Sequence, residues 1–106
     1  ESQGQYKEAE AMYRRALERQ EKVLGPDHPE TLFSIHNLGN ALESQGQYKE
    51  AVAMYQRAAD GLEKALGANH KDTLICANNL TRILNKQKSH NRTLGIGQRI
   101  RELLRF

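Results

Sequence analysis

The sequence predicts an all-α protein, an α-solenoid of antiparallel helix pairs. Three observations predict this fold: one segment recurs at a fixed offset, apolar residues recur at three- and four-residue spacing, and glycine or proline separates the helical stretches. Helix-favouring residues dominate the composition and only two prolines occur. About five helices are expected.

The repeat is visible directly in the sequence. Residues 1–9 read ESQGQYKEA and residues 43–51 read the same, an offset of 42. The offset also pairs Met12 with Met54, Tyr13 with Tyr55, His28 with His70, Leu32 with Leu74 and Asn37 with Asn79. It holds to about residue 88. Beyond that point the positions of Gly46, Tyr48, Ala51, Tyr55 and Ala58 are taken by Lys88, His90, Thr93, Gly97 and Ile100, so the last unit is degenerate.

Each period contains two helical patterns joined by a tight turn. The first has Leu32, Ile35, Leu38 and Leu42 on one face and stops at Gly46, a residue that tolerates the left-handed cap conformation. The second runs to Gly67 and buries Tyr48, Ala51, Val52, Tyr55, Ala58, Ala59, Leu62 and Leu66. In the linkers Asp27 and Asn69 are expected N-caps, with Pro29 in the first turn. The predicted helices cover residues 5–24, 29–44, 48–66, 71–87 and 94–105.

These helices divide the chain into three parts. Residues 1–24 form the second helix of a truncated first repeat, 25–66 a complete 42-residue repeat, and 67–106 a final, degenerate repeat with a C-terminal capping helix. Ile96, Ile100, Leu103 and Leu104 supply the apolar stripe of that capping helix. We expect the chain to be a segment of a longer array, and its exposed terminal helices to be able to pair with another copy.

Composition disfavours several classes of protein. No apolar run approaches the roughly 20 residues that span a bilayer, and the single cysteine, Cys76, fits a reducing, cytoplasmic setting and a buried helix position. Residues 1–81 hold nine Lys/Arg against twelve Asp/Glu, and residues 82–106 hold seven against one, so the basic character is C-terminal. Non-specific nucleic-acid contact there is the weaker alternative, since only Phe106 offers a ring for base stacking.

Catalysis and metal binding are also disfavoured. Ser34 and His36 lie two residues apart on a helix and do not face each other, so no triad is expected. His28 and His70 recur with the repeat, which favours a structural loop role, because equivalent atoms of stacked helix pairs lie too far apart to share a metal. We expect no catalytic residues, no metal and no cofactor.

The repeat resembles the tetratricopeptide family. Ile35, Leu38, Gly39 and Leu42 fill the slots of its first helix, and Gly46, Tyr48, Ala51, Tyr55 and Ala58 those of its second. The period of 42, with LGPDHPETL between units, resembles the kinesin light chain subtype and the arrays of fungal and bacterial nucleotide-binding signalling proteins of the STAND and NLR-like classes. The resemblance implies a right-handed superhelix, with the first helices lining a concave groove that binds a peptide or a partner protein.

The candidate binding residues are those of residues 29–44 and 71–87 that remain once the apolar core positions are removed. Asn37 and Asn79 stand where the resemblance places the asparagines that clamp a peptide backbone. The alternatives are solvated polar residues or bonding across adjacent helices. Arg82 and Lys86 would meet an acidic side chain or a terminal carboxylate, or else form ordinary charged surface. The full set is Phe33, His36, Asn37, Asn40, Glu43, Ile75, Asn78, Asn79, Arg82, Asn85 and Lys86.

The sequence therefore predicts a non-enzymatic protein-protein interaction module within a larger signalling or adaptor protein. A structural spacer or self-association segment is the alternative.

Overall fold

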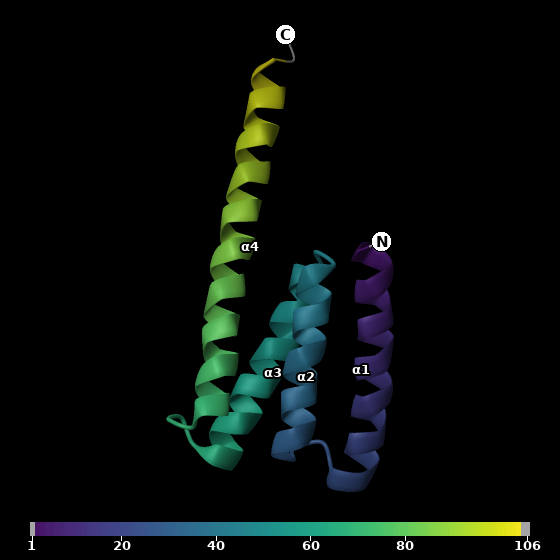
Figure 1. The fold of residues 1–106 in the computed structure, drawn as a ribbon. Coiled ribbons are helices and arrows are strands. Elements are labelled where there is room, and N and C mark those ends of the chain that lie inside the picture. The colour runs from purple at the N-terminus through teal and green to yellow at the C-terminus, as the bar shows by residue number, and fades with distance from the viewer. Residues whose placement is uncertain (1, 105–106) are drawn as a thin grey trace.

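The computed structural model describes the backbone of residues 2–104 and the side chains of residues 4–89, 103 and 104. Four α-helices follow one another: α1 (Ser2–Leu24), α2 (Pro29–Ser44), α3 (Tyr48–Leu66) and α4 (Lys71–Leu103). They lie roughly along a common direction, and α4 continues well past the ends of α2 and α3 (Figure 1). The described residues contain helices and turns only, which confirms the all-α prediction.

The prediction of about five helices is wrong for the described residues. The predicted helices 71–87 and 94–105 are parts of one helix, α4, which runs through Gly95 and Gly97 to Leu103. The cause lies at the turn position. Gly46 adopts a φ of 78° and closes the α2–α3 turn, whereas its equivalent is Lys88, which continues the helix. The apolar side chains of the predicted capping stripe at positions 96 and 100 lie outside the described side chains.

Histidines, not Asp27 and Asn69, cap the first helix of each unit. Nδ1 of His28 accepts a hydrogen bond of 3.1 Å from the Glu30 amide, and Nδ1 of His70 accepts one of 3.1 Å from the Asp72 amide. Each bond satisfies a backbone donor that the helix start leaves free. The structural loop role predicted for these histidines is confirmed, and the N-cap assignment was wrong by one residue.

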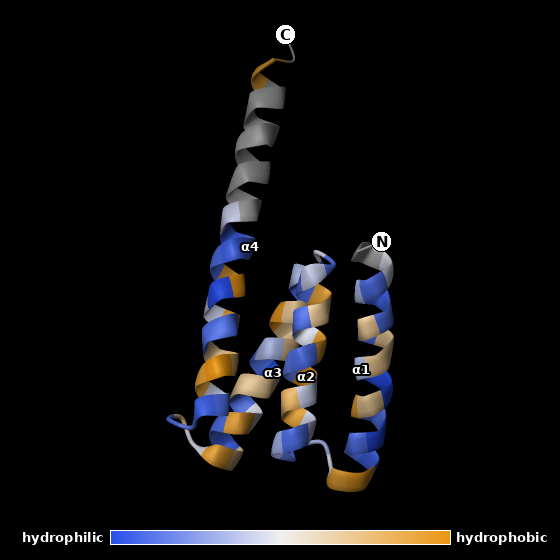
Figure 2. Ribbon diagram, viewed as in Figure 1, coloured by the Kyte–Doolittle hydropathy of each residue, from blue (hydrophilic) through white to orange (hydrophobic). Residues whose placement is uncertain are grey.

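The core lies where α2, α3 and α4 meet. Leu32, Ile35, Leu38 and Leu42 of α2 are at most 1% exposed, as their spacing predicts. One cluster joins the first two to Ala58, Ala59, Leu62 and Cys76, and a second joins the other two to Ala51, Tyr55 and Ile83. Leu17 of α1 packs against both clusters. Figure 2 shows α1 as largely hydrophilic apart from its C-terminal end, with hydrophobic residues on α2, α3 and the part of α4 beside them.

Two glycines let α2 and α3 approach each other closely. A Cβ at Gly39 would lie 2.9 Å from Cε1 of the buried Tyr55 ring, and a Cβ at Gly61 would lie 2.6 Å from Cδ2 of Leu32. Both distances are shorter than carbon atoms tolerate. The glycines are therefore required by packing between helices and not by backbone conformation.

Neighbouring units pack mainly through the contacts of α1 with α2 and of α3 with α4, and the first helices α2 and α4 make a smaller contact. Exposed ion pairs join the second helices α1 and α3, Arg14 to Glu50 at 3.5 Å and Arg57 to Glu21 at 3.7 Å. Such exposed pairs contribute little free energy, so the buried clusters dominate the stacking. None of the described helices combines the length and apolarity that crossing a bilayer requires.

Candidate interaction face

The predicted binding residues lie on α2 and α4, and the side on which these two helices contact each other is here called the α2–α4 face. At its centre Glu43 of α2 receives both guanidinium nitrogens of Arg82 of α4, Nη2 at 2.7 Å and Nη1 at 2.5 Å. Nζ of Lys86 lies 3.5 Å from the same carboxylate. A two-pronged guanidinium–carboxylate contact fixes orientation as well as distance. The pair therefore sets how the first helices of neighbouring units sit against each other.

Tyr55 of α3 also contacts this carboxylate. Its hydroxyl donates a hydrogen bond of 2.9 Å to Oε1 of Glu43 and also bonds the side-chain amide of Asn40. The bond from Arg82, with a smaller contribution from the bond of Tyr55, lowers the pKa of Glu43 to about 2 against the effect of burial. Burial raises the pKa of Tyr55, and the Glu43 carboxylate raises it further. The carboxylate is thus charged and the phenol neutral.

A second polar link joins α2 to α4 about two helical turns away. Nδ2 of Asn79 lies 2.7 Å from Nε2 of His36, whose ring is only 3% exposed. The ring stands between those of Phe33 and Tyr55, with centroids 5.2 Å from each. Burial lowers the pKa of His36, opposed by the neighbouring Asn37 side chain. The neutral ring is therefore the stable form, with Nε2 free to accept from Asn79.

The structure divides the predicted residues into two groups. The first group connects the two helices: Asn79 bonds His36, and Arg82 bonds both Glu43 and Asn79. These four side chains are therefore already paired within the protein. For Asn79 this favours the alternative of bonding across adjacent helices. The second group is exposed or partly exposed: Ile75 is 42% exposed, Asn40, Asn78, Asn85 and Lys86 are exposed, and Phe33 and Asn37 are half-buried.

Tyr55 is the residue of this face that the sequence analysis assigned only to the core. Its ring is fully buried while its hydroxyl reaches the polar cluster. The recurrence of a tyrosine at positions 13 and 55, where a wholly apolar ring would suit a core, was the available signal. Cys76, in contrast, is buried as predicted, and burial raises the pKa of its thiol to about 11.

Comparison with known families bears on this arrangement of stacked helix pairs. The family model of the tetratricopeptide repeat matches residues 1–64 and again residues 34–105. The chain belongs to the tetratricopeptide repeat family. Tetratricopeptide domains generally mediate protein–protein interaction and are typically non-catalytic. A comparison with curated proteins gives no significant match.

Proposed function

We propose that this tetratricopeptide chain binds an extended segment of a partner protein across the α2–α4 face. The main support is that this face contains two kinds of residue, one that joins the helices and one that is left exposed. Buried or paired residues fix the spacing of α2 and α4, while a row of amide, apolar and basic side chains is left exposed above them.

The exposed residues supply the chemistry that an extended peptide needs. Asn78 and Asn85, two turns apart on α4, offer amides that donate and accept together, which matches a peptide group. Asn37 of α2 offers a third amide at the repeat position equivalent to Asn79. Ile75 and Phe33 provide apolar contact. The sites are spaced along the helices, so a chain lying along the face would meet several of them.

The charge of this face favours an acidic group on the partner. Glu43 is one carboxylate placed against two cations, Arg82 and Lys86, so the cluster keeps one positive charge in excess. Lys86 is the more loosely held of the two at 3.5 Å, and its side chain is 53% exposed. We therefore propose that an acidic side chain or a terminal carboxylate of the partner binds beside Lys86.

We further propose that the module serves a larger signalling or adaptor protein in the cytoplasm, with the first helices of a longer array lining a shared concave groove. The offset of 42 residues, which resembles the kinesin light chain subtype and the arrays of nucleotide-binding signalling proteins, supports this setting. The sequence of the parent protein tests it. A neighbouring nucleotide-binding domain or coiled coil is expected there.

Selection from a displayed library of random peptides tests the proposed binding. Peptides retained by the chain should be enriched in Asp and Glu, and Asn78→Ala, Asn85→Ala and Lys86→Gln should each weaken the selected peptides by about tenfold. Lys64→Gln, an exposed lysine of α3, is the matched control and should bind as the parent does. Peptides that bind all four variants equally, or a selection without acidic enrichment, would contradict the proposal.

A further inference from the structure

The chain contains two joints of the same kind between neighbouring units, and their contacts differ in chemistry. In each joint the second helix of one unit packs against the first helix of the next, α1 against α2 and α3 against α4. The α1–α2 joint and the α3–α4 joint make contact over a similar extent. Because they are built from equivalent positions 42 residues apart, they can be compared position by position.

The α3–α4 joint is held by buried apolar side chains. Leu62 of α3 and Cys76 of α4 belong to one cluster, and both are 0% exposed. In the second cluster Ile83 of α4 lies with Ala51 and Tyr55 of α3. If these helices separated, the apolar surface would return to water, and the free energy of its burial would be lost.

At the equivalent positions the α1–α2 joint is polar. Gln20 of α1 and Ser34 of α2 take the places of Leu62 and Cys76, and the serine hydroxyl donates a hydrogen bond to the side-chain oxygen of the glutamine. Both side chains are only partly buried. Of the apolar side chains described in α1, only Leu17 packs against either buried cluster.

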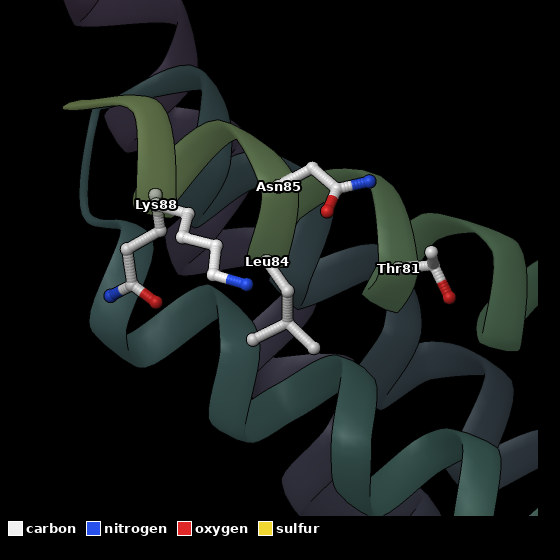
Figure 3. A pocket seen from close by; sticks show the side chains of 5 residues that line it. Thr81, Leu84, Asn85 and Lys88 are labelled. Atoms are coloured by element: carbon white, nitrogen blue, oxygen red, sulfur yellow. The ribbon is translucent and has the colours of Figure 1, made fainter. Parts of the chain in front are cut away.

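A second set of equivalent positions shows the same difference. Glu10 of α1 accepts a hydrogen bond of 2.6 Å from Nε2 of Gln45 at the end of α2. In the α3–α4 joint the place of Glu10 is taken by Val52, which packs against the second cluster and has no side-chain acceptor. The equivalent of Gln45 is Gln87, which lines a pocket whose other lining residues all belong to α4 (Figure 3).

Polar and apolar contacts respond differently when two helices separate. Partly buried hydrogen-bonding groups exchange one another for water, so little free energy is lost, whereas an apolar pair has no such replacement. The ion pairs that join α1 to α3, Arg14 with Glu50 and Glu21 with Arg57, are exposed and are screened by salt. The α1–α2 joint therefore opens at a lower cost than the α3–α4 joint.

We infer that the α1–α2 joint is a hinge of the repeat array. In the longer array proposed above, α1 belongs to the unit that precedes α2, and that unit turns at this joint while α2, α3 and α4 move as one body. The inference is independent of the proposed function, because the α2–α4 face lies wholly on that body.

Amide hydrogen exchange of the full chain, followed by NMR, tests the inference. In the parent, amides of residues 12–21 in the middle of α1 should exchange at least about tenfold faster than those of residues 51–62 in α3. Gln20→Leu/Ser34→Cys, kept reduced, gives the α1–α2 joint the pair found in the α3–α4 joint. It should slow exchange in α1 by about tenfold and leave α3 unchanged. Glu18→Leu adds a leucine to the exposed side of α1 and, as the matched control, should leave α1 as in the parent.

The double variant keeps the whole chain, so fast exchange that it removes comes from the joint and not from fraying at the end of α1. Gln20→Leu alone should slow α1 in the same direction by less, which keeps the test independent of one variant. Equal exchange rates of α1 and α3 in the parent would overturn the inference, because the helices would then open only together. So would variants in which α1 exchanges as in the parent, or in which α1 and α3 slow equally.

Discussion

The hydroxyl of Tyr55 donates a 2.9 Å hydrogen bond to Glu43, the carboxylate that also binds Arg82. A residue at the centre of the α2–α3 core thus holds the group that joins α2 to α4. Packing within one repeat and stacking between repeats therefore depend on the same side chain.

Tyr55→Phe should destabilise the chain by about 1.5–3 kcal/mol, because it removes the hydroxyl that bonds Asn40 and the charged Glu43 carboxylate and leaves the ring in place. Urea unfolding measures the effect. Tyr13→Phe is the matched control, since Tyr13 holds the equivalent position on α1 and is 37% exposed, and it should change stability little. Equal effects of the two variants would show that the Tyr55 hydroxyl makes no special contact.

Gly39→Ala should destabilise the chain by about 1–3 kcal/mol, because the added methyl would stand 2.9 Å from the Tyr55 ring and force the helices apart. Gly4→Ala provides the contrast. A Cβ at Gly4, within α1, meets nothing within 4 Å, so alanine there should stabilise the helix by about 0.5–1 kcal/mol. Thermal unfolding measures the change in stability of both variants. A Gly39→Ala variant that is more stable than the parent would contradict the close approach of α2 and α3.

Stability should fall as the pH drops below the ordinary histidine value of 6.5, because burial lowers the pKa of His36 in the folded chain. Between the folded and unfolded pKa values the unfolded chain binds more protons, so lowering the pH favours unfolding. The contribution of His36 is fully present above that range. In His36→Gln, which keeps an amide facing Asn79, urea unfolding at a series of pH values should show a shallower decline. Identical declines would exclude His36, since every other group is the same in both proteins.

The packed core could be predicted from the sequence, and much of the polar surface could not. The 42-residue offset and the spacing of Leu32, Ile35, Leu38 and Leu42 determine which faces are buried, because burial follows helical periodicity. Whether Asn79 and Arg82 point at a ligand or at His36 and Glu43 depends on the distance between two helices, which periodicity does not contain. Lys88 shows another limit of prediction from the sequence. The degenerate last unit keeps the 42-residue offset but has lost the glycine that makes the turn.

Glu43 and Arg82 join α2 to α4, and a double-mutant cycle measures that contact directly. Unfolding free energies are compared for the parent, Glu43→Gln, Arg82→Gln and the double variant. Solvent weakens the attraction between the two charges because Arg82 is about half exposed. Glu43, in contrast, is 11% exposed and accepts two guanidinium bonds. We predict a coupling free energy of about 1 kcal/mol. Additive effects of the two substitutions, with no coupling, would contradict the stacking described here.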